Sequence, residues 1–350
     1  MDDADLLERS GRQRQGGGSP LVAIGVLVLC CAGWGYSFPV MQFATRAFDR
    51  HVLGPGASDD WRKFASRALF NGVRFGLAAL LYGAVTWRRQ RGFSRSDVLG
   101  GAVVGTFFAG GMLLQVTGLR WVVPSVSSFF TALPVVFAPV AQSLVFRRPV
   151  GRATWGAVGL AFVGIVLLSW PKPEAVAAAN SAIVTPPIPY LGEMLTILGA
   201  AVFTAEIICV HHFGQSADAV RLTLVMLVST AVLSLIVSVV LGGHGMMRAS
   251  AVAGLLRDRE VAWTMATLVA FSSVLALHWM NTYQPRVSPA IASVVYCTEP
   301  LFGTLASLAF ATERLTLLTV AGGLVVLVSV LVVATAGPDP KLAAEGHLGQ

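Results

Sequence analysis

The feature that most constrains this sequence is a series of apolar runs, each about 20 residues long, that recurs along most of the chain. A helix of about 20 residues is about 30 Å long, which is the thickness of the hydrocarbon core of a bilayer. Hydrophobic residues make up 55% of the 350 residues and charged residues only 12%, with a mean hydropathy of +0.70. Soluble domains carry about 25% charged residues. The sequence therefore predicts an all-α integral membrane protein.

Ten such runs are present, and they predict ten transmembrane helices. Connections rich in arginine or proline separate them, such as residues 147–149 after the fourth run. The predicted helices cover residues 21–42, 68–87, 98–119, 123–146, 153–170, 191–213, 220–241, 261–282, 289–310 and 316–336.

A Pro- and Ala-rich stretch at residues 171–189 separates the first five helices from the last five. The first run is longer than the 7–15-residue apolar region of a cleaved signal peptide, so we expect it to be retained as a helix. Residues 44–67 form a long connection, in which a short interfacial helix is one alternative. The predicted units are an N-terminal tail 1–20, a five-helix repeat 21–170, a linker 171–190, a second five-helix repeat 191–336 and a C-terminal tail 337–350.

The formal charge of +7 comes from cations spread among the connections, without the basic patch and interleaved aromatic residues of nucleic-acid-binding proteins. Segments on the side of the N-terminus hold slightly more Lys and Arg than the opposite loops, which predicts cytoplasmic termini. Arginine far outnumbers lysine in an Ala-, Gly- and Val-rich background, which favours a GC-rich bacterial genome and the inner (cytoplasmic) membrane.

All four cysteines fall inside apolar runs, with no CxxC motif and no metal-ligand spacing to histidine: Cys30, Cys31, Cys209 and Cys297. We interpret them as packing residues and predict no metal site and no cofactor. The glycines at 101, 105, 322 and 323 are interpreted in the same way, as positions where helices approach closely.

An internal repeat becomes visible when Pro134 is placed on Pro300, because residues 131–150 then align with residues 297–316. Arg148 falls on Arg314 in this alignment, and each copy runs from a proline-containing helix through a charged turn into a Gly-rich helix. Five helices per half is an odd number, so the second copy is predicted to be inverted relative to the first. Many secondary transporters have such inverted repeats, with the binding site between the halves near the membrane midplane.

These patterns resemble the drug/metabolite transporter (DMT) superfamily, specifically its ten-helix type built from two EamA domains. The similarity extends over roughly residues 21–336 and includes GWGYSFPVMQ at 33–42, VRF at 73–75 and, most specifically, SPAIASVVYCTEPLFGTLASLAFATERL at 288–315. The sequence departs from the family pattern with Arg147-Arg148 where Glu313-Arg314 is the usual type of pair, and with Gln42 where many relatives carry lysine. The resemblance implies a central cavity and transport of small metabolites, amino acids or amphipathic drugs.

Ionisable residues inside membrane spans are costly and are therefore candidates for function. Glu299 lies in the middle of the ninth run directly before Pro300, where the helix is weakened, and is a candidate proton or amine carrier. The alternative is that its carboxyl only bonds to freed backbone or to an arginine. Glu206 lies slightly past the middle of the sixth run with no cation within a helical turn. It is a candidate for binding an amine or a second proton, or else a structural ion-pair partner.

Two further ionisable residues carry weaker expectations. Arg74 is close enough to the outer end of the second run to reach the interface, and snorkelling or a structural ion pair is favoured over a carboxylate clamp. His278 lies near the inner end of the eighth run, where an interfacial hydrogen bond is favoured over a pH-responsive gate.

Aromatic and small polar residues supply other candidate cavity groups, although membrane aromatics more often serve packing. Trp34, Tyr36, Tyr296 and Ser293 are the candidates, and Ser293, Tyr296, Pro300 and Gly303 share one helix face. Three mid-membrane prolines are candidate hinges, namely Pro39, Pro134 and Pro300.

The sequence favours a secondary transporter that works by alternating access and exports its solute in exchange for protons, with uncoupled facilitation and a channel as alternatives. An ATP-binding GxxxxGK[ST] motif is absent, as are the HExxH and GxSxG motifs of an intramembrane enzyme, so we predict a non-enzyme. The expected partners are a small-molecule solute, the lipid bilayer and coupling protons. A monomer and a homodimer both fit the sequence, and the substrate is left open.

Overall fold

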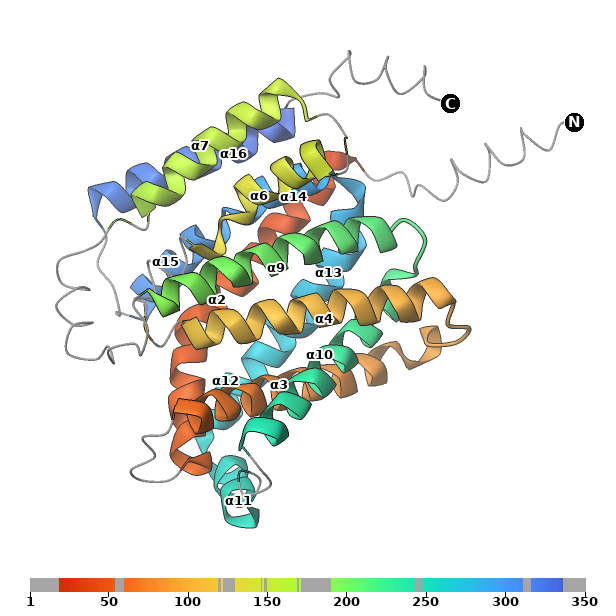
Figure 1. Cartoon of the computed structure of the whole chain (residues 1–350), viewed down its shortest axis with the longest axis vertical. Coiled ribbons are helices and arrows are strands. Elements are labelled where there is room, and N and C mark those ends of the chain that lie inside the picture. The colour runs from red at the N-terminus through yellow and green to blue at the C-terminus, as the bar shows by residue number, and fades with distance from the viewer. Residues whose placement is uncertain are drawn as a thin grey trace, which may run out of the picture.

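The computed structural model describes residues 19–53, 60–118, 121, 130–145, 147, 150–168, 170, 190–242, 246, 248–310 and 316–335. Within these ranges all regular secondary structure is helical, and the helices lie roughly side by side (Figure 1). The described residues exclude most of the predicted N-terminal tail, the C-terminal tail, most of the 171–190 linker, Arg148 and the Glu313-Arg314 pair.

Eight helical segments in the described ranges are long and apolar enough to cross a membrane, and two apolar helices are shorter. Six of the eight are single helices: α2 (Pro20–Val52), α3 (Asp60–Thr86), α4 (Arg95–Gly118), α9 (Leu191–Phe213), α10 (Ala219–Gly242) and α16 (Leu317–Thr335). The other two are composite: α12 (Arg259–Thr267) continues through a π-helical segment (Leu268–Leu275) into α13 (Ala276–Tyr283), and α14 (Pro289–Tyr296) is followed by α15 (Glu299–Ala309). The shorter helices are α6 (Pro134–Val140), which ends in a π-helical turn (Ala141–Val145), and α7 (Arg152–Leu168).

The eight long segments coincide with eight of the predicted runs, and α6 and α7 fall within the remaining two, at 123–146 and 153–170. The first part of the 123–146 run lies outside the described residues. All-helical architecture is therefore confirmed for the described chain.

The predicted 44–67 connection differs from the structure, because α2 continues to Val52 and α3 already starts at Asp60. Contacts between the two extensions account for this: Ser66 donates to Asp49 Oδ1 (2.5 Å), and the rings of Phe48 and Phe70 pack edge to face 5.6 Å apart. The connection is thus mostly two helix ends held against one another.

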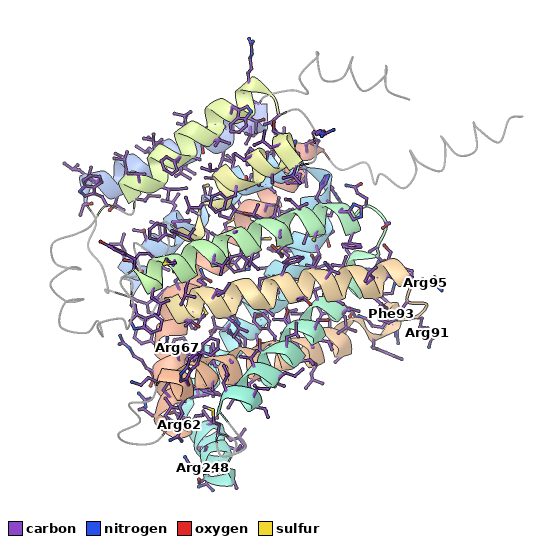
Figure 2. All side chains as sticks on the ribbon, viewed as in Figure 1. Arg62, Arg67, Arg91, Phe93, Arg95 and Arg248 are labelled. Carbon is purple, nitrogen blue, oxygen red and sulfur yellow. The ribbon has the colours of Figure 1, made fainter. Side chains whose placement is uncertain are left out.

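The outer surface of the bundle is apolar along its middle. Leu80 and Ile236 are 72% and 52% exposed, as expected for side chains that face lipid. The labelled arginines lie at the helix ends, with Arg62, Arg67 and Arg248 at one end of the bundle and Arg91 and Arg95 at the other (Figure 2). A multi-pass membrane protein has this distribution of apolar and charged groups.

The helices pack in a regular set of pairs. α3 lies against α10, and α4 lies against both α9 and α10 (Figure 1). α2 crosses α12, α13 and α15, while α6 pairs with α14 and α7 pairs with α16. The peripheral helix α11 (Ala249–Arg257) sits at one end, next to α2 and α12.

Two glycines illustrate how closely these helices approach one another. A Cβ atom on Gly105 would lie 2.7 Å from the carbonyl oxygen of Met226, so α4 can approach α10 only without a side chain there. A Cβ atom on Gly322 would lie 2.6 Å from the backbone nitrogen of Leu168, which fixes the contact between α7 and α16. The interpretation of Gly105 and Gly322 as packing positions is confirmed.

Candidate functional site

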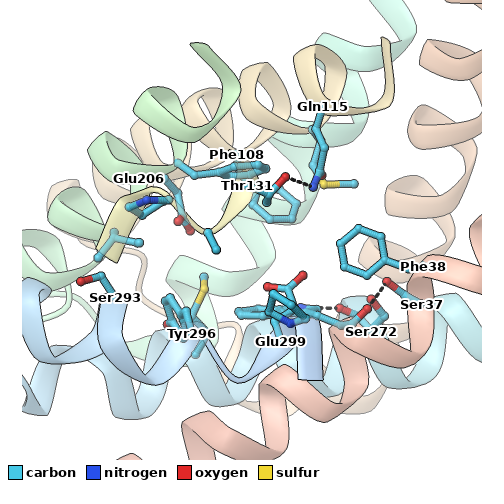
Figure 3. A pocket seen from close by; sticks show the side chains of 18 of the residues that line it. Ser37, Phe38, Phe108, Gln115, Thr131, Glu206, Ser272, Ser293, Tyr296 and Glu299 are labelled. Atoms are coloured by element: carbon cyan, nitrogen blue, oxygen red, sulfur yellow. Dashed lines mark hydrogen bonds between the residues drawn. The ribbon is translucent and has the colours of Figure 1, made fainter. Parts of the chain in front are cut away.

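A cavity lies in the middle of the bundle, with about 930 Å³ of empty space including the part open to its surroundings. Its lining comes from α2, α3, α4, α9, α13, α14, α15, the π-helical segment Leu268–Leu275 and the start of α6. Helices from both parts of the chain that flank the 171–190 stretch therefore share the cavity. Figure 3 shows two walls, with Phe108 and Glu206 on one and Tyr296 and Glu299 on the other.

Glu299 enters the cavity at a break in the ninth apolar segment. α14 ends at Tyr296 and α15 begins at Glu299, with Pro300 in its first turn, where a missing N–H costs no hydrogen bond. The hydroxyl of Thr298 donates to the carbonyl of Val295 (2.8 Å) and satisfies one backbone group at the break. Glu299 thus sits at a helix N-terminus, where exposed N–H groups favour a negative charge.

Glu206 comes from the middle of α9 and faces the same cavity (Figure 3). The residue is only 4% exposed, and its Oε1 atom has no hydrogen-bond partner. None of the ion pairs between described residues involves it. A buried carboxyl oxygen without a donor is costly, so this atom is an open acceptor site in the cavity wall.

Arg74 is the cation of the cavity, and its surroundings differ from the snorkelling interpretation. It is 3% exposed and points inward, where Nε donates to Ser273 Oγ (2.9 Å) and one terminal nitrogen donates to Ser272 Oγ (2.8 Å). Its guanidinium also lies 5.0 Å from the ring centre of Phe75. A structural ion pair is not found among its described contacts, which are all with neutral groups.

Both serines that bond to Arg74 lie in the π-helical segment Leu268–Leu275. Wider π turns disturb the regular backbone bonding of a helix and occur frequently at functional sites. Here the carbonyl of Ser272 accepts a hydrogen bond from Trp34 Nε1 (3.2 Å) while its hydroxyl accepts from Arg74. One residue of the eighth apolar segment therefore orients both a cavity ring and the cavity cation.

Aromatic side chains form much of the remaining wall. Trp34 and Tyr296 pack edge to face 5.4 Å apart, and Phe108 lies 6.2 Å from Phe203 across from them. The hydroxyl of Tyr296 donates to Gln284 Oε1 (2.6 Å), so its polar end is already bonded. The aromatic rings of these residues therefore remain available to contact a solute.

Most of the sequence candidates do line this cavity, while three do not. Trp34, Arg74, Glu206, Ser293, Tyr296, Glu299, Pro134 and Pro300 are among its lining residues. His278 instead bonds through Nδ1 to the hydroxyl of Tyr82 (2.8 Å), and Tyr36 packs 6.1 Å from Phe310, so neither is at the cavity. Pro39 lies inside α2, which continues past it to Val52.

Sequence reasoning missed Phe108, Phe203 and the hydrogen-bonded pair of lining residues Gln115 and Thr131 (3.0 Å). Gln115 was detectable as a polar residue in an apolar run. The phenylalanines carried no signal because such residues are common in every membrane helix.

The EamA-like transporter family matches residues 59–170 and 190–335, which is well over half of the chain. The chain belongs to the EamA-like transporter family. This establishes the DMT superfamily assignment and, with the apolar helices, a multi-pass membrane transporter.

One relative and one solved structure are similar to this chain over most of its length. An uncharacterized transporter from Archaeoglobus fulgidus is 24% identical over 310 residues, covering 88% of this chain and 84% of the relative. A solved structure, described only as the crystal structure of a protein, superposes with a TM-score of 0.63 at 13% identity, covering 90% of this chain and 98% of the other. At that identity the likeness concerns the fold alone.

Proposed function

We propose that this EamA-family chain is a secondary transporter that moves a small amphipathic solute across the cytoplasmic membrane by alternating access. The observation that carries the proposal is the central cavity, in which Glu206 and Glu299 face one another from opposite walls and Arg74 lies between serines. Ionisable groups at this depth are expensive and serve solute or ion binding in membrane proteins.

The helix pairs support two inverted five-helix repeats, with α6 and α7 as the fourth and fifth helices of the first. Rotation about a twofold axis in the membrane plane exchanges the first helix with the sixth, the second with the seventh, and so on. Such a rotation brings a helix next to its own counterpart near the axis, and α3 with α10, α6 with α14 and α7 with α16 are such pairs. It also relates the pair α4 and α9 to the pair α12–α13 and α2.

Charged contacts at the two ends of the bundle support the same relation. At one end Asp97, in the first turn of α4, lies 2.8 Å from Arg221 Nε, at the start of α10. At the other end Asp258, the N-cap of α12, lies 2.8 Å from His51 Nε2, near the end of α2. In both contacts, an acid at the start of the third helix of one repeat pairs with a basic residue that lies next to the first connection of the other repeat. α3, whose 27 residues span about 40 Å, runs from one end of the bundle to the other.

Helix breaks provide places where the bundle can bend around the cavity. Pro134 begins α6 and Pro300 lies in the first turn of α15, and both prolines line the cavity. Since they are also the aligned prolines of the internal repeat, each repeat would bend at the same point. We assign them as hinges of the transport cycle, and Pro39 is left as a weaker candidate within a continuous α2.

Export in exchange for protons is the coupling that the cavity chemistry favours. A carboxyl such as Glu299 can hold a proton or a cationic solute in turn, which is the requirement for exchange. Uncoupled facilitation by the same cavity is the alternative. We further propose that the termini are cytoplasmic, following the cation distribution of the sequence. A monomer and a homodimer are both compatible with this cycle.

Solute-dependent proton flux in proteoliposomes tests the proposal. The full-length protein is reconstituted with an internal pH dye and exposed to a panel of amino acids, amines and cationic drugs. We expect at least one solute to trigger a pH change that Glu299→Gln abolishes. Glu193→Gln is the control, because Glu193 lies on the same helix as Glu206 but outside the cavity lining, and this variant should preserve the pH change. Solute movement without proton movement, or a Glu299→Gln variant like the wild type, would contradict proton exchange.

A further inference from the structure

The unpartnered oxygen of Glu206 identifies the part of the solute that the cavity recognises. Oε1 of Glu206 lies in the lining of the cavity and accepts no hydrogen bond, although the residue is 4% exposed. Buried carboxyls in membrane proteins are ordinarily paired with a cation or a donor. A solute that carries a hydrogen-bond donor would supply the missing partner of Oε1.

Two polar groups of the aromatic cavity wall, the hydroxyl of Tyr296 and the indole N–H of Trp34, already donate to other acceptors. The hydroxyl of Tyr296 donates to Gln284, whose amide in turn donates to the carbonyl of Ile207 beside Glu206 (2.7 Å). The indole N–H of Trp34 donates to the carbonyl of Ser272. Both aromatic residues thus present rings to the cavity while their polar ends are occupied.

The charges of the cavity favour a positively charged solute. Its lining contains two carboxyls, Glu206 and Glu299, and one guanidinium, Arg74. All three nitrogens of the guanidinium already donate hydrogen bonds, to Ser272, Ser273 and Met41. Oε1 of Glu206, in contrast, has no hydrogen-bond partner. When all three groups are ionised, the cavity carries one net negative charge. A solute with one positive charge would balance it, and an anion would not.

The walls around Glu206 define the rest of the solute. Phe108 and Phe203 on one wall face Trp34 and Tyr296 on the other, which suits a flat apolar group and also favours a nearby cation through the ring faces. Resting on the proposed transport function, we propose that Glu206 is the specificity-determining residue that binds the ammonium group of an amphipathic aromatic amine.

Binding to the full-length protein in detergent tests this assignment without requiring transport. The probes are 1-naphthylmethylammonium, the uncharged 1-naphthalenemethanol and the anionic 1-naphthylacetate, and the readout is calorimetric affinity. We expect the ammonium probe to bind at least about tenfold more tightly than the alcohol. Glu206→Gln should remove this preference while leaving the affinity for the alcohol unchanged, and Glu193→Gln should behave as the wild type.

A conservative variant keeps the test decisive if Glu206→Gln does not fold. Glu206→Asp retains the charge and should retain a preference for the ammonium probe, so its loss would overturn the assignment. A preference that survives Glu206→Gln, equal affinity of the wild type for ammonium and alcohol, tighter binding of the acetate, or no binding of the ammonium probe would each overturn it as well. Binding that depends on Glu206 without any transport in proteoliposomes would contradict the proposed function alone.

Discussion

Asp258 and His51 join two helices that are far apart in the sequence, with Asp258 Oδ2 lying 2.8 Å from His51 Nε2. Arg50 adds to the contact at 3.6 Å from the same carboxylate and pairs with Glu260. The carboxylate also caps α12, because its other oxygen accepts from the backbone N–H groups of Glu260 and Val261. One acidic residue thereby starts a helix and holds it against the end of α2.

The stability that Asp258 contributes should disappear at acidic pH. The hydrogen bond with His51, helped by the N–H groups of Glu260 and Val261, lowers the pKa of Asp258 below its usual 3.8 even though burial opposes this. A carboxyl with a lowered pKa stabilises the fold above the unfolded pKa and loses that contribution as the pH falls through the folded value.

Asp258→Asn tests this because asparagine keeps the helix cap and removes the charge. We expect the variant to melt at a lower temperature than the wild type at pH 6, with the difference shrinking below about pH 4. Thermal unfolding of the purified proteins between pH 3 and pH 7 measures it. A difference that stays constant across this range would show that the charge of Asp258 is not involved.

The Asp97 contact at the opposite end should matter more, because the side chain of Asp97 is fully buried. It accepts from the backbone N–H groups of Ser94 (2.8 Å) and Asp218 (2.7 Å) and pairs with Arg221. Asp97→Asn should destabilise the protein by about 1–3 kcal/mol, the cost of unsatisfied buried groups. Chemical denaturation of both variants in detergent at pH 6 measures this loss of unfolding free energy. A smaller loss for Asp97→Asn than for Asp258→Asn would contradict the ranking.

Close packing of α7 on α16 predicts opposite results for two glycines. Gly322→Ala places a methyl group 2.6 Å from the backbone of Leu168, so it should cost about 1–3 kcal/mol through overpacking. Gly156→Ala in α7, the partner helix of α16, is the matched control, because its Cβ atom would meet nothing within 4 Å and alanine favours a helix. Equal melting temperatures for the two variants would contradict the described contact.

The buried hydroxyls around Arg74 predict a coupled effect on stability. Replacing Ser272 and Ser273 together with alanine removes two hydrogen bonds to a buried cation, each worth about 1.5–3 kcal/mol. The same replacements should cost little in an Arg74→Met background, since the charge is then gone. A double-mutant cycle by denaturant unfolding measures the coupling, and additive losses would show that the serines do not support Arg74.

Much of the helical layout could be predicted because the bilayer requires long apolar runs. The extension of α2 to Val52 could not, since it depends on contacts such as Phe48 with Phe70 that join distant segments. The π-helical segment at Leu268–Leu275 was also hidden, because its apolar composition equals that of an ordinary helix.

The candidate site was predicted only in part, for related reasons. Glu206 and Glu299 stood out because charge is rare inside an apolar run. The position of Arg74 in the sequence suggested the interface, yet Ser272 and Ser273 from a distant segment draw it inward. For His278 a hydrogen bond was the favoured interpretation, and its ring bonds to the hydroxyl of Tyr82 and does not line the cavity.

Solute counterflow in proteoliposomes tests the central claim, alternating access around the Glu206–Glu299 cavity, most directly. Vesicles are preloaded with one unlabelled solute from a panel of amines, amino acids and cationic drugs, and a trace of the same labelled solute is added outside. Alternating access predicts a transient accumulation of label above equilibrium for at least one solute, abolished by Glu206→Gln or Glu299→Gln. Protein-dependent entry that only reaches equilibrium would contradict alternating access and indicate a channel.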